Sequence, residues 1–359
     1  MYKQIGILTG GGDAPGLNAV IRSVVRTATG KFGMKVIGIE DSFEGILGET
    51  HTMSLTPKVV SGILPRGGTI LGTRNRGSFV KMVNGAPVYP ELPIGEAIAN
   101  LDILGIEALI VLGGEGTLAI AEQFDKRGFP VIGVPKTIDN DLAATELTFG
   151  FMTAIDIATE ALDRLHTTAA SHDRVMVLEV MGRHTGWIAL HAGLAGSADI
   201  ILIPEIPFDL SKVGEHILTR DRLGARFSIV VAAEGATPVG GGRVVVDPGS
   251  ALRQERLGGI GFRVASDLER AIGRETRCVL LGHLQRGGAP TSADRLLATR
   301  FGVHAVELVL ARDWGCMVAL TPPTLTAVAL ERVVNRQRTV PHNCDLIRAA
   351  RAIGIGFGD

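Results

Sequence analysis

The sequence predicts an α/β protein of two similar lobes, each a mainly parallel sheet flanked by helices, with the active site in the cleft between them. Three observations lead to this prediction. Short apolar runs bounded by Gly and Pro alternate with helical stretches, which is typical of βαβ units and a parallel sheet. At 359 residues the chain suits about two domains of roughly 150 residues each. Its hydrophobic content of 46% is enough for a sizeable core.

The first lobe repeats one pattern twice. The chain opens with strand, glycine loop, helix and strand, expected at 4–9, 10–16, 17–28 and 34–39. After an irregular region, the pattern recurs as helix, strand, glycine loop, helix and strand, expected at 94–105, 108–112, 113–117, 118–128 and 129–134. Between the two repeats, the loop at 64–79 is rich in Gly and Arg, and such long loops are uncommon unless they bind something.

The second lobe follows a helix at 149–166. Its strands are expected at 175–180, 200–203, 227–233 and 276–281, with helices between them. Residues 237–250 form a Gly-rich insertion that we expect to be a surface hairpin. We expect residues 1–145 with roughly 285–335 to form a nucleotide-binding lobe, and residues 146–284 with the C-terminal segment to form a sugar-phosphate-binding lobe.

Charge, cysteine content and hydropathy exclude several classes of protein. The formal net charge of −1 gives no electrostatic case for nucleic acid or an anionic membrane as a partner. The three cysteines, Cys278, Cys316 and Cys344, have no metal-binding spacing and favour a reducing compartment. No apolar run approaches the ~18 residues of a membrane span, and the N-terminal apolar segment is too short for a signal peptide. We therefore expect a soluble cytoplasmic protein.

The stretch 135–142, PKTIDNDL, places a lysine, a threonine, carboxylates and an amide directly after a buried strand. Taken alone, it is equally well a polar turn. The glycine loops at 10–16 and 113–117 shift the balance, because amides at a helix N-terminus bind anions. Neither loop fits the Walker A or GxGxxG pattern. Two such loops beside a carboxylate cluster nevertheless predict a polyphosphate site.

Polar residues also recur where strands of the second lobe end, at Arg183, Glu234, His283 and Arg286. Each alone is more often structural, but their shared position favours one cleft. Phosphoryl transfer needs an anion cradle, a cation that bridges phosphates and a group that orients the attacking hydroxyl. A carboxylate at Glu115 or Asp139 suits Mg²⁺, and the basic residues suit a phosphorylated sugar whose hydroxyls donate to Glu234.

Six motifs occur in the order found in the 6-phosphofructokinase family: GGGDAPGLN, GGEGT, PKTIDND, VMGR, AAEG and GHLQRGG. The chain resembles this family from the first strand to about residue 310. The resemblance implies transfer of the γ-phosphoryl group of ATP to O1 of fructose 6-phosphate, with Mg²⁺, to give fructose 1,6-bisphosphate and ADP.

The resemblance also implies roles for individual residues. Asp139 is similar to the general base, Thr137 to the residue that bonds the transferring phosphoryl group, and Asp141 to a second orienting carboxylate. The donor site implied by the resemblance comprises Gly11, Gly12, Arg74, Asn75, Gly114, Glu115, Gly116, Thr117 and Lys136. The implied sugar-phosphate site comprises Arg174, Met181, Gly182, Arg183, Glu234, Arg277, His283 and Arg286. In this family, arginines matching Arg174 and Arg277 come from a neighbouring subunit, which implies a homo-oligomer, a dimer or a tetramer.

Two positions depart from the family pattern. Glu115 stands where the family usually has Asp as Mg²⁺ ligand, so direct and water-mediated coordination both stay open. The family usually has a nucleotide-binding arginine after the turn that begins LGT. Here the sequence is LGTRNR, with Asn75 at the expected position and Arg74 and Arg76 on either side.

The phosphoryl donor depends on two further positions. Gly116 resembles ATP-dependent relatives, since pyrophosphate-dependent relatives have an Asp that would crowd and repel the nucleotide α-phosphate. Lys136 resembles the pyrophosphate type. Room for the nucleotide is an exclusion criterion, whereas a lysine near a polyphosphate is tolerable with either donor. We therefore expect ATP, with pyrophosphate as the alternative.

Regulation and rival functions complete the expectations. Four residues resemble part of a bacterial effector site for ADP and phosphoenolpyruvate: Arg22, Arg26, Arg66 and Glu205. Two further positions of that site usually hold basic residues, but here they are His166 and Ala225. Surface arginines on a helix explain these equally well.

An NAD or lipid kinase shares the GGDGT-like turn but does not explain the second-lobe residues. A non-catalytic regulatory subunit would lack residues such as Asp139, Thr137 and Arg183, which are present.

Overall fold

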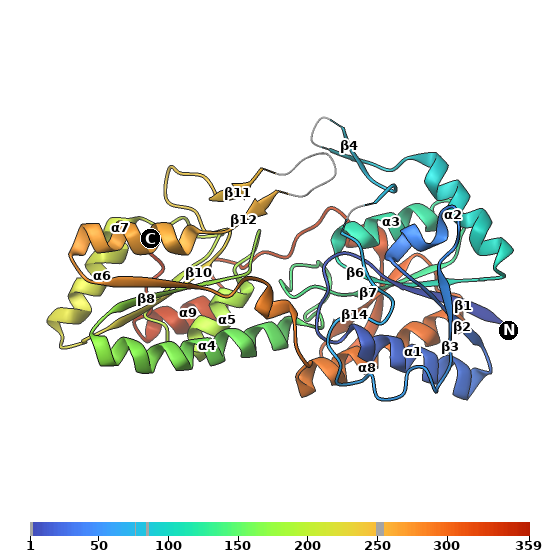
Figure 1. Ribbon diagram of the computed structural model, residues 1–359, viewed down its shortest axis with the longest axis horizontal. Coiled ribbons are helices and arrows are strands. Elements are labelled where there is room, and N and C mark those ends of the chain that lie inside the picture. The colour runs from blue at the N-terminus through green and yellow to red at the C-terminus, as the bar shows by residue number, and fades with distance from the viewer. Residues whose placement is uncertain (1–2, 76, 84–85, 249–254) are drawn as a thin grey trace. The chain divides into compact units, whose positions relative to one another are not determined.

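The computed structural model describes residues 3–75, 77–83, 86–248 and 255–359, and shows the α/β fold that the sequence predicts (Figure 1). These residues form two compact units. The first contains the described residues up to 152 together with 286–337, and the second contains those from 153 to 285 together with 338–359.

The first unit is built on a seven-stranded sheet in the order β15-β14-β7-β6-β1-β2-β3. The strands are β1 (Gln4–Thr9), β2 (Lys35–Ile39), β3 (Thr52–Leu55), β6 (Leu109–Gly113), β7 (Val131–Pro135), β14 (Cys316–Thr321) and β15 (Thr324–Ala329). The five inner strands are parallel, and β3 and β15 add to the two edges antiparallel. The parallel strands are apolar along their length because both faces of the sheet are covered.

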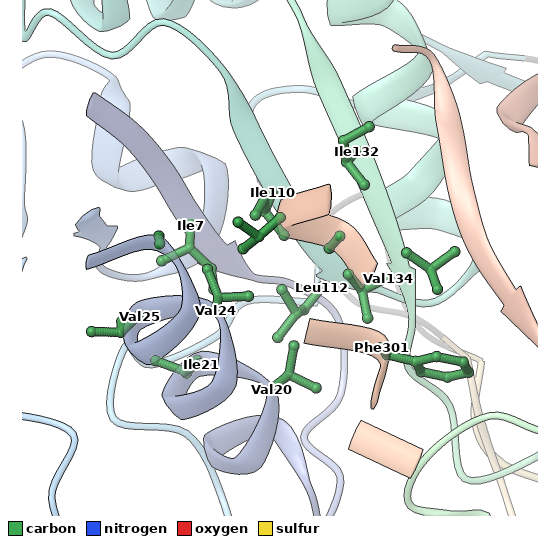
Figure 2. Packing of buried hydrophobic residues seen from close by; sticks show 14 of the residues in the cluster. Ile7, Val20, Ile21, Val24, Val25, Ile110, Leu112, Ile132, Val134 and Phe301 are labelled. Carbon is green, nitrogen blue, oxygen red and sulfur yellow. The ribbon is translucent and has the colours of Figure 1, made fainter. Parts of the chain in front are cut away.

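Helices cover both faces of this sheet. They are α1 (Leu17–Phe32), α2 (Glu91–Ile103), α3 (Glu115–Asp125) and α8 (Ser292–Ala311). α1 and α8 pack on one face, and α2 and α3 pack on the other. Figure 2 shows Val20, Ile21 and Val24 of α1 directed toward the sheet residues Ile110 and Leu112 in the core that they share with α8.

Short elements of the first unit were not predicted from the sequence. The irregular region between the two repeats contains η1 (Ser42–Ile46), β3 and a small hairpin of β4 (Lys81–Val83) and β5 (Ala86–Val88). Near the end of the chain, β14, β15 and η3 (Leu330–Arg332) form where the sequence looks less regular. The Pro322–Pro323 pair, which marks a break in the sequence, lies in the turn between β14 and β15.

The second unit has a four-stranded parallel sheet in the order β13-β8-β10-β9. Its strands are β8 (Val175–Val180), β9 (Ile200–Leu202), β10 (Ser228–Ala233) and β13 (Thr276–Leu280). Its helices are α4 (Phe151–His172), α5 (Trp187–Ala195), α6 (Leu210–Arg222), α7 (Ile260–Ile272) and α9 (Asp345–Ala352). α6 and α7 pack on one face, and Figure 1 shows α4, α5 and α9 on the other.

A hairpin of β11 (Val245–Asp247) and β12 (Arg256–Leu257) lies between β10 and α7. Only β11 falls within the insertion expected at 237–250, and β12 follows it. The short η2 (Gly282–Arg286) follows β13. Among the described residues, no helix combines the length and the apolar character needed to cross a bilayer.

Each sheet has a point where neighbouring strands send the chain to opposite faces. In the first unit these strands are β1, followed by α1, and β6, followed by α3. In the second unit they are β8, followed by α5, and β10, followed after the hairpin by α7. Open α/β sheets bind their ligands at the carboxyl ends of such strand pairs. Candidate site residues occur at both of these points, among them Gly11 and Gly116 in the first unit and Arg183 and Glu234 in the second.

Candidate active site

The first glycine loop, after β1, is tied to its neighbours through its backbone. Gly10 N donates to Leu112 O of β6 at 2.9 Å, and Gly11 N donates to Arg74 O at 2.9 Å. Thr73 Oγ1 donates in return to Gly11 O at 2.6 Å. A Cβ on Gly10 would lie 2.6 Å from a methyl carbon of Thr117, so only glycine allows this approach to the second loop.

The second glycine loop, after β6, leads directly into α3. Thr117 N and the next amide both donate to Gly114 O, which starts the first helical turn. The side chain of Glu115, the first residue of α3, accepts from Asn335 N through Oε1 at 3.0 Å. Gly116 is exposed, and a Cβ there would meet no heavy atom within 4 Å, so this face of the helix N-terminus is open. A helix N-terminus with this opening suits an anionic group.

Lys136 connects the two loops from the end of β7. Its side chain is 3% exposed, its N donates to Gly113 O at 3.0 Å, and its Nζ donates to Gly12 O. Burial, and then the charge of Arg286, lower the pKa of Lys136 to about 7, against the opposing effect of Asp13, Asp141 and Asp139. The expected donor-site lysine therefore binds the backbone of the first loop.

Arg286 binds the same loop one residue further on. Its Nη1 donates to Asp13 O at 3.1 Å. In a trans peptide the C=O and the N–H point in opposite directions. When Lys136 and Arg286 bind the carbonyls of Gly12 and Asp13, the N–H groups of the same two peptide units therefore point away from these cations. Arg286 was expected among the sugar-phosphate residues, and the structure brings it to the first glycine loop.

The segment that carries the expected catalytic residues is held by local hydrogen bonds. Thr137 Oγ1 accepts from Asp139 N at 3.1 Å, and Thr148 Oγ1 donates to Thr137 O at 2.6 Å. Asn140, in a left-handed conformation with φ of 51°, accepts from Thr148 N at 3.0 Å. Asp139 and Asp141 are half-buried, and the negative charge of each raises the pKa of Lys136. The structure thus brings these two carboxylates to the edge where the glycine loops lie.

The LGTRNR segment lies beside the first loop through its main chain. Arg74 O accepts from Gly11 N, while the exposed Arg74 side chain pairs with Asp41 at 3.5 Å. Asn75 is exposed. Arg76, the third candidate of this segment, lies outside the described residues.

In the second unit, the ends of β8 and β10 approach each other closely. Gly235 N donates to Gly182 O at 3.0 Å, and a Cβ on Gly235 would lie 2.1 Å from Arg183 O. Gly182 has a φ of 141°, which favours glycine. Glu234, half-buried, follows β10 at this edge, and its N donates to Val180 O. Glu234 and Arg183 therefore share the carboxyl edge of the second sheet.

Three residues that the sequence did not single out hold this edge. Arg183 donates through Nη1 to Glu255 O at 2.8 Å and through Nη2 to Glu255 Oε2 at 2.9 Å. Gln285, fully buried, accepts from Met181 N at 2.7 Å and donates to Ala154 O. His283, in the same short η2, is exposed.

Glu179 is the third of these residues and lies within β8. Its carboxylate, 2% exposed, accepts from Gly259 N at 3.0 Å and Gly261 N at 2.7 Å at the start of α7. Burial raises the pKa of Glu179, and these backbone hydrogen bonds oppose the increase. A glutamate inside the apolar run 175–180 was the sequence signal for such a role, because buried charges need partners.

Arg174 and Arg277 lie at the opposite end of the second sheet. Both donate to Glu275 Oε1, at 2.8 and 2.5 Å. Arg174 precedes the first residue of β8, whereas Arg183 follows its last, and the six residues of the strand span roughly 20 Å at ~3.3 Å each. Within one chain, the structure does not bring these two arginines to the edge of Arg183.

The candidate effector residues divide between the units. In the first unit, Arg22 is half-buried, and Arg26 and Arg66 are exposed. In the second, Glu205 accepts from Gly186 N and Val340 N, and His166 Nε2 contacts Gly196 O at 2.8 Å.

The carboxylates present suit a metal bound together with a ligand better than a metal held by the protein alone. In the part of the chain that the structure describes, no group of three or more His, Cys, Asp or Glu side chains could hold a metal ion by itself. Mg²⁺ typically takes one or two carboxylates and completes its coordination with phosphate oxygens and water. Glu115, at the N-terminus of α3 beside the donor loops, fits this mode.

Two glycine loops at the switch point of a parallel sheet, with carboxylates beside them, define an α/β protein that binds a polyphosphate or nucleotide. Comparison with known families makes this more specific. Residues 4–309 match the family model described as phosphofructokinase, and the chain belongs to this family. The prediction of a phosphotransferase of this family is thereby confirmed.

Individual relatives agree with this assignment. The ATP-dependent 6-phosphofructokinase of Chloroflexus aurantiacus is 54% identical over 99% of this chain and 98% of its own. A pyrophosphate–fructose 6-phosphate 1-phosphotransferase of Streptomyces coelicolor is 50% identical over 94% of this chain and 96% of its own. Among solved structures, phosphofructokinase from Saccharomyces cerevisiae is similar with a TM-score of 0.78 and 31% identity, over 92% of this chain. The match spans 45% of the yeast chain.

Proposed function

We propose that this protein is a glycolytic, cytoplasmic ATP-dependent 6-phosphofructokinase that phosphorylates fructose 6-phosphate at O1 and releases fructose 1,6-bisphosphate and ADP. Asp139 accepts the proton of the 1-hydroxyl, which moves to its carboxylate oxygen as the hydroxyl oxygen attacks the γ-phosphorus. Thr137 bonds the transferring phosphoryl group, and Asp141 orients the site. The first unit binds the nucleotide, and the second binds the sugar phosphate.

One observation carries this proposal above the others. The carboxylates of Asp139 and Asp141 are close enough to Lys136 to raise its pKa, and Lys136 donates hydrogen bonds to both glycine loops. A proton acceptor, an anion-binding pair of loops and a helix N-terminus therefore meet at one sheet edge, as phosphoryl transfer requires. The name of the Chloroflexus aurantiacus relative, 54% identical, points to the same reaction.

The metal and the assembly are part of the proposal. Glu115 would hold Mg²⁺ together with the nucleotide phosphates, and the ion would supply positive charge to the phosphoryl group being transferred. The protein is a homo-oligomer, a dimer or a tetramer, in which Arg174 and Arg277 complete the sugar-phosphate site of a neighbouring copy. Their position roughly 20 Å from the Arg183 edge of their own sheet supports this arrangement.

Pyrophosphate is the second candidate donor, favoured by Lys136 and by the Streptomyces coelicolor relative. Two observations favour ATP. The ammonium of Lys136 is bonded to Gly12 O, and the space beside Gly116 is open for a nucleotide.

The test is turnover of the purified protein with Mg²⁺, fructose 6-phosphate and either ATP or pyrophosphate, measured as formation of fructose 1,6-bisphosphate. We expect ATP to support the higher kcat/KM. Fructose without a phosphate is the matched control and is expected to be inactive. A preference for pyrophosphate would replace the donor, and turnover of another phosphorylated sugar in place of fructose 6-phosphate would overturn the acceptor.

A further inference from the structure

The insertion that forms the β11–β12 hairpin has no part in the reaction proposed above, yet it touches a candidate site residue. Glu255, directly before β12, accepts from Arg183 through its main-chain oxygen at 2.8 Å and its Oε2 at 2.9 Å. The Arg183 side chain is 20% exposed and that of Glu255 is 38% exposed. Because the arginine is largely withdrawn from water, this pair is screened less than an ordinary surface pair.

The segment that carries Glu255 is attached at one end to β8 and at the other to a residue that follows β8. Glu179 of β8 accepts the N–H groups of Gly259 and Gly261, which follow β12. Four residues after Glu179, Arg183 donates to Glu255. Residues 255–261 therefore contact residues 179–183 at each end. The attachment at Glu179 is independent of Arg183 and keeps Glu255 within a few residues of a fixed point.

The middle of this segment is fixed as well. Leu257 is 7% exposed and pairs with Val245 across the hairpin, and Gly258 N donates to Val244 O at 3.3 Å. The acceptor on Arg183 thus directly precedes a short strand that pairs with β11.

The geometry leaves Arg183 able to bind a ligand at the same time. A guanidinium has five N–H donors, and the two bonds to Glu255 leave at most three. A long arginine side chain loses rotamer freedom when it is immobilised. If an acceptor has already fixed the side chain, this loss no longer opposes ligand binding.

We propose that Glu255 is a positioning residue, which holds the Arg183 guanidinium in one orientation and so prepares its remaining donors for the phosphorylated sugar. This inference rests on the proposed function, in which Arg183 binds that sugar. Competition with the ligand is the alternative. It is disfavoured because Glu255 takes at most two of the five donors, and because one of its two acceptors is main-chain oxygen.

The test compares Glu255→Ala with Glu255→Gln, using KM for fructose 6-phosphate, kcat and KM for ATP. Glu255→Ala is expected to raise KM for fructose 6-phosphate about tenfold, since loss of orientation weakens binding, with kcat and KM for ATP unchanged. Glu255→Gln keeps an oxygen acceptor for Nη2 and is expected to stay within about threefold of wild type. The matched control is Glu160→Ala, which removes the exposed pair with Arg164 on α4 in the same unit and should change nothing.

An unchanged or lowered KM in Glu255→Ala overturns the positioning role. Melting temperatures of all variants check that the fold is intact.

Arg183→Ala and the double variant separate the positioning role of Glu255 from the sugar-binding role of Arg183. Arg183→Ala should raise KM for fructose 6-phosphate, and Glu255→Ala should add nothing in that background. If Arg183→Ala leaves KM unchanged, the sugar-binding role of Arg183 fails and the positioning role falls with it. If Arg183→Ala raises KM but Glu255→Ala does not, only the positioning role fails.

Discussion

The backbone at the two sheet edges that carry the candidate site residues is fixed by different kinds of side chain, by cationic donors at one edge and by acceptors at the other. At the first edge, the cations Lys136 and Arg286 donate to the backbone carbonyls of Gly12 and Asp13. At the second edge, the side chains that fix the backbone are acceptors: Glu179 on Gly259 and Gly261, Gln285 on Met181, and Glu205 on Gly186.

This difference shows how each edge can meet an anion. Cations on carbonyls turn neighbouring amides outward, so the first edge can bind phosphates through its main chain and the N-terminus of α3. Carboxylates and amide oxygens use up main-chain N–H groups at the second edge, so an anion there depends on side chains such as Arg183. We therefore expect the first edge to be sensitive to added side-chain atoms and the second to the loss of them.

Gly116→Asp is the sharpest test of a main-chain donor site, and we expect it to abolish turnover with ATP. A Cβ at Gly116 would meet no heavy atom within 4 Å, so the fold should survive, but the carboxylate would repel the nucleotide α-phosphate. KM for fructose 6-phosphate, measured wherever turnover remains detectable, should not change.

The control for this variant is Gly116→Asn, which has the same size without the charge and so separates crowding from repulsion. It should lower ATP turnover, but less than Gly116→Asp does. If Gly116→Asp turns over ATP as well as wild type does, the open space beside Gly116 is not where the nucleotide lies.

Asp139→Asn tests a residue that we assign to chemistry rather than to either binding edge. Its kcat should fall by roughly 10²–10⁴, the usual contribution of a general base, while both KM values stay near wild type. The exposed Asp163→Asn on α4 serves as control. Near-normal kcat in Asp139→Asn would remove it from the role of base.

Lys136→Met tests whether a buried cation organises the first edge. We expect KM for ATP to rise roughly tenfold, because the Gly12 carbonyl loses its donor and the loop is less well oriented. KM for fructose 6-phosphate should not change. Lys126→Met, which removes an exposed lysine of the same unit, is the control.

Although Lys136→Met should weaken ATP binding, it should make the folded protein more stable. Burial lowers the pKa of Lys136 to about 7, so the folded chain lacks a proton that the unfolded chain binds between about pH 7 and 10.5. The free energy of unfolding therefore does not include a cost for burying this charge above about pH 10.5. It decreases as pH falls, until the full cost applies below about pH 7. Lys136→Met should therefore have a higher Tm than wild type at pH 6, and the difference should shrink toward pH 10. A lower Tm at pH 6 would show that the hydrogen bond to Gly12 outweighs the cost of burying the charge.

The sequence was sufficient where structure follows from local pattern. Alternating apolar runs and glycine turns predicted the α/β fold, because a strand, a tight turn and a helix each leave a short periodic signal. The Gly-rich composition of 237–250 predicted an insertion there, but the second strand of the observed hairpin lies beyond it. The edge strands β3 and β15 were missed, since short, partly exposed strands carry little periodicity and form by pairing with strands already in place.

The candidate site was less predictable because its contacts are far apart in the chain. Lys136 could be identified as a site residue, but its partner Gly12 lies 124 residues away, and the partner of Arg286 lies 273 residues away. Likewise, Glu255 lies 72 residues from Arg183. Such contacts depend on sheet order and loop register, which no local sequence pattern encodes. Only Glu179, a charge inside an apolar strand, carried a visible signal.

The late position of β14, β15 and α8 in the chain has a consequence for biosynthesis. α8 covers the same face of the first sheet as α1, and β14 pairs with β7. A nascent chain that has emerged only to residue 285 would hold β1, β6 and β7 with part of their apolar surface, including Val134, uncovered. Exposed apolar surface of this kind promotes aggregation and chaperone binding on the ribosome. The first unit to be translated can thus be completed only when residues up to Gln337 have left the exit tunnel.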